Sequence, residues 1–188
     1  ICQPQVKAKQ QQFDVFIHDI CAEEVLCDSV RLNQVLLNLL SNAIKFTPDG
    51  GEIHMALYEE TSPKGENFVR IHIQVKDTGI GMSDQFMEHL FDSFAREDSA
   101  RVARTEGTGL GMAITKFIVV DAMGGSIDVK SHQGKGTEFS VTLDLEKAEV
   151  LEEDMILPNW NMLVVDDDKQ LCESTVASLA SIGVSAEW

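Results

Sequence analysis

The sequence predicts an α+β fold, in which amphipathic helices pack against strands that alternate in polarity. Apolar residues recur at i, i+3 and i+4 across residues 32–44, which is the spacing of a helix with one buried face. In residues 52–59 and 68–77 apolar and polar side chains alternate instead, which is the pattern of β-strands. The turn-forming residues 62–67 between the two segments indicate a hairpin. The strands expected in the C-terminal half are residues 126–131 and 137–145.

The N-terminal part of the chain predicts shorter elements. Residues 1–12 are polar and rich in Gln, as at the end of a helix or in a linker, and residues 13–17 and 24–27 have the composition of short strands. An Asp-Ser pair at residues 28–29 can cap the amphipathic helix. The strong breakers in residues 47–51 then end that helix.

Beyond the hairpin, residues 83–94 predict a short helix. Residues 95–106 are polar and lack an apolar period, which predicts a mobile loop. A second helix is expected at residues 108–123, because glycines precede it and Gly124-Gly125 follows it. One domain is therefore expected over residues 13–146, followed by an acidic linker at residues 147–160.

Composition narrows the class of protein. The 188 residues are 44% hydrophobic, which suffices for a core, and no apolar run approaches the roughly 20 residues of a membrane span. The net charge of −16 argues against nucleic-acid binding, which requires Lys and Arg to neutralise phosphates. The four cysteines form no CxxC pair, which favours a reducing cytoplasm. The chain starts without Met, and we expect it to be a segment of a longer protein.

Three polar residues interrupt the amphipathic helix. Asn38 and Asn42 are four residues apart, so they lie on one stripe of the helix, and Lys45 extends this stripe by a turn. Asn is a poor helix former, so two stacked amides need a reason. An amide oxygen is a ligand for Mg²⁺ and an ammonium group binds phosphate, although two solvated Asn on an exposed edge would show the same pattern.

Glycine-rich loops follow three of the predicted elements. Residues 77–82 place Asp77 at the end of a buried strand, where the carboxylate can accept from an amine, and its glycines let a flat ligand approach the backbone. Residues 107–112 lead directly into a helix, a setting that suits phosphate. Residues 134–139 form the third loop. Any one of them could be a tight turn, and residues 107–112 lack the GxGxxG spacing of a dinucleotide fingerprint.

Arginine is concentrated in the loop before the second glycine segment. The chain has few Arg residues, yet Arg96, Arg101 and Arg104 all fall in residues 95–106. This clustering is typical of a lid with cationic groups for a polyphosphate. The alternative is that the acidic residues of the same loop pair with them as a solvated surface run.

These motifs together resemble the sensor histidine kinases. The run from Asp28 through Asn38, Asn42 and Lys45 resembles their asparagine box, and Asp77-x-Gly-x-Gly resembles their first glycine box. Phe-Asp-Ser-Phe-x-Arg at residues 91–96 resembles their phenylalanine box, and the other glycine loops match the remaining boxes in order. The resemblance covers residues 13 to 145 and implies a Bergerat-type α+β two-layer sandwich. In that fold a mixed sheet is backed by three helices, and ATP lies beneath a lid.

The resemblance also implies roles. Asn42 would hold Mg²⁺, Asp77 would accept from the adenine amino group, and Thr137 would lie near adenine. The catalytic residues would be Asn38, Lys45, Arg96 and Arg104. The residues implied to bind ATP are Asn38, Asn42, Lys45, Asp77, Gly79, Ile80, Gly81, Gly107, Thr108, Gly109, Leu110, Gly111 and Thr137.

The C-terminal segment, residues 161–188, resembles the start of a response-regulator receiver domain. A buried-type strand at residues 162–165 is followed by Asp166 and Asp167, which in that family bind Mg²⁺ near a phosphoacceptor Asp. A helix is expected at residues 169–182. The resemblance implies an incomplete flavodoxin-like fragment, and an acid-capped strand–helix turn is the alternative.

Function follows from the combined resemblance. A kinase domain before a receiver is the pattern of a hybrid histidine kinase, which would donate the γ-phosphoryl group of ATP to a His on dimerisation helices expected before residue 1. Receiver domains or response regulators would be its partners, and the parent would be a homodimer, possibly membrane-anchored, with a cytoplasmic kinase core. Two alternatives remain: an ATP hydrolase of the same fold, disfavoured because Asn38 stands where the hydrolases have a Glu base, and a non-enzymatic nucleotide-binding regulator.

Overall fold

The computed structural model describes residues 3–22, 24–97, 107–148, 161–165, 169, 172, 175, 176, 179, 180 and 184–188. The chain forms two compact units, Ile1–Ala148 and Glu149–Trp188. Within the described residues no helix is long and apolar enough to cross a membrane.

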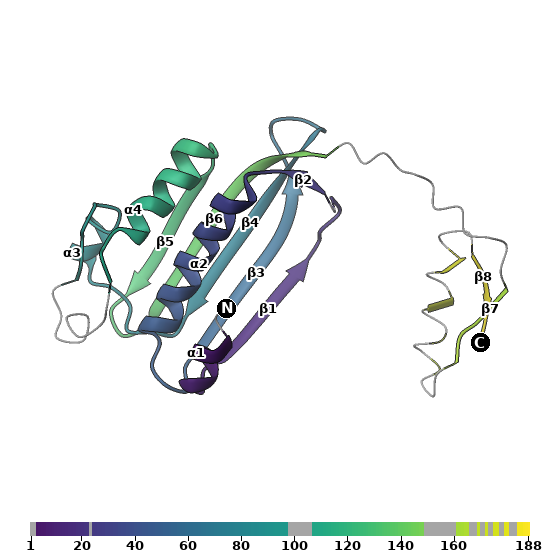
Figure 1. Cartoon of the computed structure of the whole chain (residues 1–188), viewed down its shortest axis with the longest axis horizontal. Coiled ribbons are helices and arrows are strands. Elements are labelled where there is room, and N and C mark those ends of the chain that lie inside the picture. Colours follow the sequence, from purple (N-terminus) through teal and green to yellow (C-terminus); the bar gives the residue numbers. More distant parts are fainter. Residues whose placement is uncertain are drawn as a thin grey trace. The chain divides into compact units, whose positions relative to one another are not determined.

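The first unit is built on a six-stranded mixed sheet with the order β1-β3-β4-β6, in which β2 and β5 both pair with β6 (Figure 1). Strands β1 and β3 are parallel, and the other pairs are antiparallel. The strands are β1 (Gln12–His18), β2 (Val25–Leu26), β3 (Glu52–Thr61), β4 (Phe68–Asp77), β5 (Ser126–His132) and β6 (Gly136–Lys147). The expected hairpin is therefore confirmed, and the short N-terminal strands are present.

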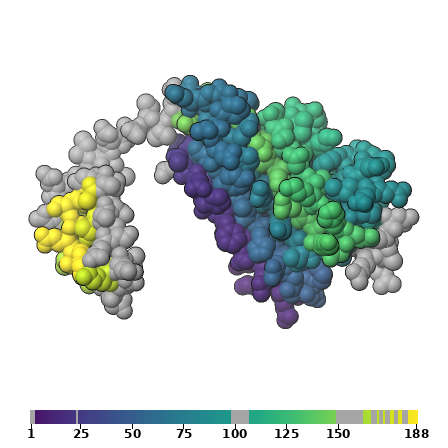
Figure 2. Space-filling view, turned by 180° about the vertical axis from the view of Figure 1, so that it is seen from behind, coloured from purple at the N-terminus to yellow at the C-terminus, as the bar shows by residue number. Residues whose placement is uncertain are grey.

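Helices cover one face of this sheet. In Figure 1, α2 and α4 lie against the strands, whereas Figure 2 shows the molecule from the opposite side, where the colours of the first unit run from purple through blue to green. The α+β sandwich predicted from the sequence is confirmed. The helices are α1 (Gln3–Ala8), α2 (Ser29–Phe46), α3 (Asp84–Met87), α4 (Gly111–Lys116) and a π-helical segment (Phe117–Ala122).

Helix α2 follows the predicted pattern closely. Asp28 caps it, since its Oδ1 accepts from the backbone N–H of Arg31 at 3.1 Å, and the helix ends before Thr47. The centre of its apolar stripe is buried in the core, where each large aliphatic side chain contributes about 1.5–3 kcal/mol, and Leu32, Leu36 and Leu40 beside it are partly buried. The buried residues of this stripe are Val35, Leu39, Ala43 and Ile44.

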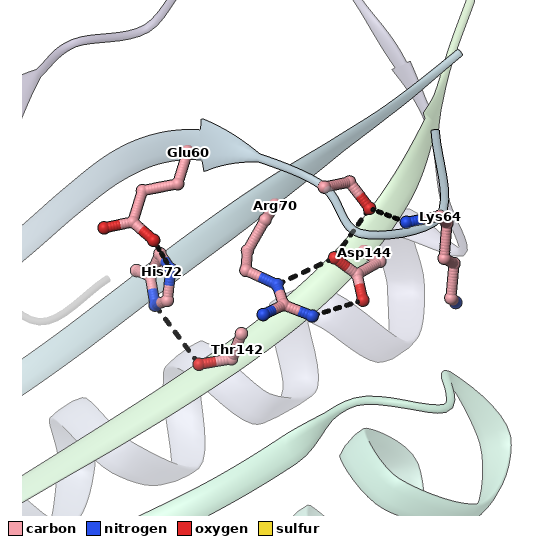
Figure 3. Close-up of polar contacts among 7 residues, drawn as sticks. Glu60, Lys64, Arg70, His72, Thr142 and Asp144 are labelled. Carbon is pink, nitrogen blue, oxygen red and sulfur yellow. Dashed lines mark hydrogen bonds and ion pairs between the residues drawn. The ribbon is translucent and has the colours of Figure 1, made fainter. Parts of the chain in front are cut away.

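The end of the hairpin farthest from the glycine loops is held by an ion pair (Figure 3). Arg70 of β4 donates to Asp144 of β6 through two parallel bonds, Nε to Oδ1 and Nη2 to Oδ2, each 2.9 Å long. Ser62 in the hairpin turn donates to the same Oδ1 at 2.9 Å, and the backbone of Lys64 donates to Ser62. Hydrogen bonding from Arg70 holds the pKa of Asp144 below its ordinary value.

Two predicted helices differ in extent. The segment expected at residues 83–94 is helical only from Asp84 to Met87, because Phe94 adopts a left-handed φ of 66° and donates its N–H to Gly109 at 3.0 Å. A contact with a distant loop thus replaces the helical continuation. The helix expected at 108–123 begins at Gly111 and becomes π-helical after Lys116.

The second unit contains a parallel pair of short strands, β7 (Asn161–Leu163) and β8 (Ser185–Glu187). Between them the described residues from 169 to 180 are helical, as expected. Cys172 and Val184 are buried within this unit. Asp166 and Asp167 lie outside the described residues, so the strand–helix–strand order is observed and the receiver assignment stays a prediction.

Candidate functional site

A pocket lies where the last residue of β4 and the first residues of β6 meet the C-terminal half of α2. Both glycine loops after β4 and before α4 contribute to it, as does the described part of the predicted lid. Its walls are formed by Asn42, Ala43, Lys45, Phe46, Asp77, Ile80, Gly81, Met82, Phe86, Leu90, Ala95, Arg96, Glu97, Gly107, Gly109, Met112, Thr137 and Phe139. Most of the residues predicted to bind the nucleotide therefore converge. The predicted residues that are not part of the wall are Asn38, Gly79, Thr108, Leu110 and Gly111.

Asp77 is the buried carboxylate of this pocket, with a residue exposure of 6%. Its Oδ1 accepts from the backbone N–H of Gly79 at 2.8 Å. Burial raises its pKa to about 6, and hydrogen bonds from the backbones of Gly79 and Thr137 partly oppose this rise. Near neutral pH the group is therefore mainly ionised, and it can accept a hydrogen bond from an amine in a site with little water.

The first glycine loop is fixed between two other elements. The N–H of Ile80 donates to Phe46 at the end of α2 at 3.2 Å, and Ile80 accepts from Gly134 of the third loop at 2.7 Å. A side chain at Gly81, whose φ is +62°, would collide with the carbonyl of His132. Glycine is needed there because the loop packs directly on the β5–β6 turn.

The two amides of α2 hold α4 in place. Asn38 Nδ2 donates to the carbonyl of Gly111 and to the hydroxyl of Thr115, both at 3.3 Å. Asn42 Nδ2 lies 3.4 Å from the sulfur of Met112, which leaves Oδ1 as the atom able to bind a metal ion. Both Asn residues are half-buried, so the alternative of two solvated amides does not apply.

Lys45 brings positive charge to the second glycine loop. Its ammonium lies 4.9 Å from the ring centroid of Phe46, and a Cβ at Gly107 would approach the same nitrogen to 2.8 Å. Gly109 has a φ of +71° and packs on the backbone of Phe94 and Ala95, so no larger residue fits. Backbone groups of residues 107–109 and an ammonium group consequently share one side of the pocket.

The predicted lid is described in part. Arg96 and Glu97 line the pocket, and Glu97 accepts from the backbone of Ser83 at 3.1 Å. Arg101 and Arg104 lie outside the described residues.

Sequence reasoning missed the residues that hold the C-terminus of α2. Lys9 Nζ donates to the carbonyls of Ile44, Lys45 and Thr47 at 2.6–3.1 Å, and Gln11 Nε2 donates to two of the same oxygens. Both residues come from the polar stretch expected to be a linker, which carries no pattern that points to this role. They fix the backbone from which Lys45 enters the pocket.

Ser131 was also missed. Its hydroxyl contacts Thr137 at 2.9 Å, donates to the carbonyl of Gly136 and accepts from the backbone of Met82 at 2.9 Å. The signal that could have found it is the register of β5 on β6, which pairs Ser131 with Thr137. That pair of hydroxyls fixes the polar corner beside Asp77.

The residues present fit an adenine nucleotide. Apolar side chains of Met82, Leu90 and Phe139 enclose the region around Asp77, which suits a flat base with an amino group. Among the described residues no three His, Cys, Asp or Glu side chains are grouped to hold a metal ion. A metal bound through Asn42 would therefore take its other ligands from phosphate and water, as Mg²⁺ does.

Comparison with known proteins also identifies an ATPase domain in this chain. Residues 27–147 match the model of the family described as histidine kinase-, DNA gyrase B- and HSP90-like ATPase. The sensor histidine kinase GacS of Pseudomonas protegens is 38% identical over 155 residues, and the sensory/regulatory protein RpfC of Xanthomonas campestris pv. campestris is 35% identical over 182 residues. These alignments cover 82% and 96% of this chain, but the chain spans only 16% and 24% of the two relatives.

Solved structures share the fold. The crystal structure of full-length ShkA in complex with AMPPNP superposes with a TM-score of 0.64 at 25% identity, covering 98% of this chain and 36% of that one. The chain therefore belongs to the histidine kinase-, DNA gyrase B- and HSP90-like ATPase family, and it carries the catalytic ATPase domain of the sensor histidine kinases.

Proposed function

We propose that the pocket binds ATP with Mg²⁺ and that the domain donates the γ-phosphoryl group to a histidine on dimerisation helices outside these 188 residues. The phosphoryl group would then pass to an aspartate of a receiver domain. The observation that carries this proposal is the buried Asp77 carboxylate in a pocket whose wall also includes Lys45, Asn42 and two glycine loops.

Adenine would be selected at Asp77. A buried ionised carboxylate accepts the hydrogen bond of the exocyclic amino group, with Thr137 and the hydroxyl of Ser131 beside it. A base with a carbonyl at that position would set two acceptors against each other, and the buried charge would be left without a partner. ATP is therefore favoured over GTP.

The triphosphate would lie along the second glycine loop. Lys45 and Arg96 supply positive charge, residues 107 to 111 supply backbone N–H groups, and Asn42 Oδ1 would hold Mg²⁺. When bound, Mg²⁺ neutralises charge on the phosphate oxygens. The residues of the chain then position the γ-phosphorus for an external nucleophile, which is the main demand of phosphoryl transfer.

Transfer to a protein histidine is favoured over hydrolysis of ATP. Asn38 stands at the position of a general base, but an amide does not take up a proton near neutral pH. Its Nδ2 is already engaged with Gly111 and Thr115, which makes it part of the α2–α4 contact. Water is therefore not activated by this side chain.

The second unit is proposed to be the start of a receiver domain, with Asp166 and Asp167 as its acidic pair. The parallel β7–β8 pair around a helix supports this, because receivers begin with that unit. A receiver and the dimerisation helices would thus be the partners of the ATPase domain, in a homodimeric parent whose kinase core is cytoplasmic.

Two experiments test this function. Calorimetry of the chain with ATP should give binding that strengthens with Mg²⁺, and Asn42→Ala should remove that metal dependence; Asn67→Ala in the hairpin turn is the matched control. Incubation with labelled ATP and a protein carrying the dimerisation helices should give acid-labile phosphohistidine. Binding of ATP without any transfer would favour a non-enzymatic regulator, and release of phosphate alone would favour a hydrolase.

A further inference from the structure

Strand β1 leaves an apolar edge of the sheet uncovered. It pairs with β3 on one side, and no other strand in the described part of the chain pairs with it. Figure 1 shows β1 at the rim of the first unit. Three consecutive residues are largely exposed: Val15 at 49%, Phe16 at 54% and Ile17 at 64%. Such an edge presents unpaired backbone N–H and C=O groups beside apolar side chains.

Several of the usual protections of an edge strand are missing here, and Asp14 is its one acidic residue. Residues 12–18 contain neither Pro nor Lys, and the register of β1 on β3 runs through all seven residues without a bulge. Edge strands in monomeric proteins commonly carry one of these features, because they prevent pairing with another chain. An unprotected edge of this length is suited to a further strand.

We propose that two copies of this chain associate through β1, paired antiparallel about a two-fold axis at Phe16, so that their sheets become continuous. This interface is separate from the nucleotide pocket, and it does not depend on the function proposed above.

The sequence of β1 is complementary to itself in this register. A two-fold axis at Phe16 places Asp14 opposite His18 of the second copy, twice, and Val15 opposite Ile17, also twice, with Phe16 facing its own equivalent. Aspartate opposite histidine is a complementary pair, because a carboxylate accepts from an imidazole N–H. Within one copy His18 Nδ1 contacts Asp19 at 2.7 Å and Asp14 lies 3.5 Å from His54, so His18 Nε2 and the second Asp14 oxygen would make the contact between copies. Paired aromatic residues across strands also stabilise a sheet.

Neighbouring registers lose this complementarity. Pairing that keeps the helices of both copies on one side of the sheet requires the axis to pass through a residue, because side chains alternate between faces. Moving the axis to Val15 would place Asp14 opposite Phe16, and moving it to Ile17 would place Asp14 opposite Ile20. Only the axis at Phe16 pairs the carboxylate of β1 with a basic side chain.

Both faces of the joined sheets would be continuous. Val15 and Ile17 lie beside Met55 and Leu57, which pack on the core, so their contact extends the layer beneath the helices. On the other face, His18 stacks on Tyr58 with centroids 5.3 Å apart. Pairing at Phe16 would continue these aromatic contacts across the two copies.

Sedimentation velocity of the whole chain over a range of concentrations tests the proposal. A near-physiological ionic strength is needed, because each copy carries a net charge of −16. The sedimentation coefficient should rise from that of a monomer to that of a dimer. Ile17→Lys should raise the dissociation constant at least tenfold, whereas Val30→Lys, at an α2 position that is 75% exposed, should leave it unchanged. A wild-type chain that sediments as a monomer at every concentration would overturn the proposal.

A charge exchange tests the register. Asp14→Lys alone should weaken association, because it sets an amine opposite His18, and adding His18→Asp should restore it. Circular dichroism of each variant checks that the chain is folded. If the double variant associates no better than Asp14→Lys alone, the register at Phe16 is wrong. Protection of the β1 amides from hydrogen exchange in a monomeric chain would show that another segment covers the edge, and this result also overturns the proposal.

Discussion

Two carboxylates of the same antiparallel strand pair have opposite surroundings. Asp144 of β6 is opposite Arg70 of β4 and forms a bidentate ion pair with it, which lowers its pKa (Figure 3). Asp77 ends β4 at the other extremity, opposite Thr137, where burial raises its pKa to about 6. The first carboxylate is already satisfied within the fold. The second is desolvated and receives only backbone donors, which is the condition of a group kept for a ligand.

The largest expected difference concerns nucleotide affinity. Asp77→Ala should weaken ATP binding about a hundredfold, since a hydrogen bond to a buried charge contributes about 1.5–3 kcal/mol. Asp144→Ala, the matched control at the other end, should change the affinity by less than about threefold. Calorimetric titration with ATP measures both. Equal losses in the two variants would mean that Asp77 acts only through the fold.

The two carboxylates should also differ in how they change the stability of the fold with pH. The folded state holds the Asp77 proton up to about pH 6, whereas the unfolded chain releases it near the ordinary value of 3.8, so this group lowers stability as pH rises through that window. The expected change is about 2–3 kcal/mol, since one pKa unit corresponds to about 1.4 kcal/mol. Asp144 has the opposite sign, because its contribution is lost as pH falls through its lowered pKa.

Urea unfolding from pH 7 down to below the ordinary carboxyl value of 3.8 measures this dependence for both groups. In Asp77→Asn the fall in stability between pH 4 and pH 6 should disappear. The loss of stability at lower pH, which comes from Asp144, should remain. Binding of adenosine, which has no phosphate to titrate, should weaken below about pH 6. A profile that is the same with and without the Asp77 carboxyl would contradict the assignment.

Removal of the Asp144 carboxylate, which is paired with Arg70, should have a smaller effect, and this effect is on stability. Asp144→Ala should lower the free energy of unfolding by about 1–3 kcal/mol, because it also removes the acceptor of Ser62 and leaves Arg70 half-buried without its partner. Urea unfolding at pH 7 gives this value. Asp128→Ala on the neighbouring strand β5 is the control, and it should cost less than about 0.5 kcal/mol.

The smallest effect is expected for Arg70→Lys. Lysine keeps the charge but loses one of the two parallel bonds, so the cost in stability should be smaller than that of Asp144→Ala. In thermal unfolding, the Tm of Arg70→Lys should lie between the Tm of the wild type and that of Asp144→Ala. A fall as large as that of Asp144→Ala would show that the fork geometry, rather than the charge, stabilises this end.

Periodicity alone determined much of this protein. The apolar stripe of α2, its Asp28 cap and the alternation of β3 and β4 are local patterns, and each formed the expected element. The glycine loops were equally visible, because glycine is favoured where the backbone takes a positive φ or packs closely on another chain segment. These features depend on residues close together in the sequence.

Tertiary structure decided the rest. The helix expected at 83–94 stops at Met87, because Phe94 is turned by its contact with Gly109. The glycines that follow Asp77 marked it in the sequence as a carboxylate for a ligand, but no local pattern showed what Asp144 contacts. The register of β4 on β6 brings Arg70 to Asp144 and leaves Thr137 beside Asp77. Register depends on pairing between residues far apart in the chain, so the partners of both carboxylates are decided only once the sheet is formed.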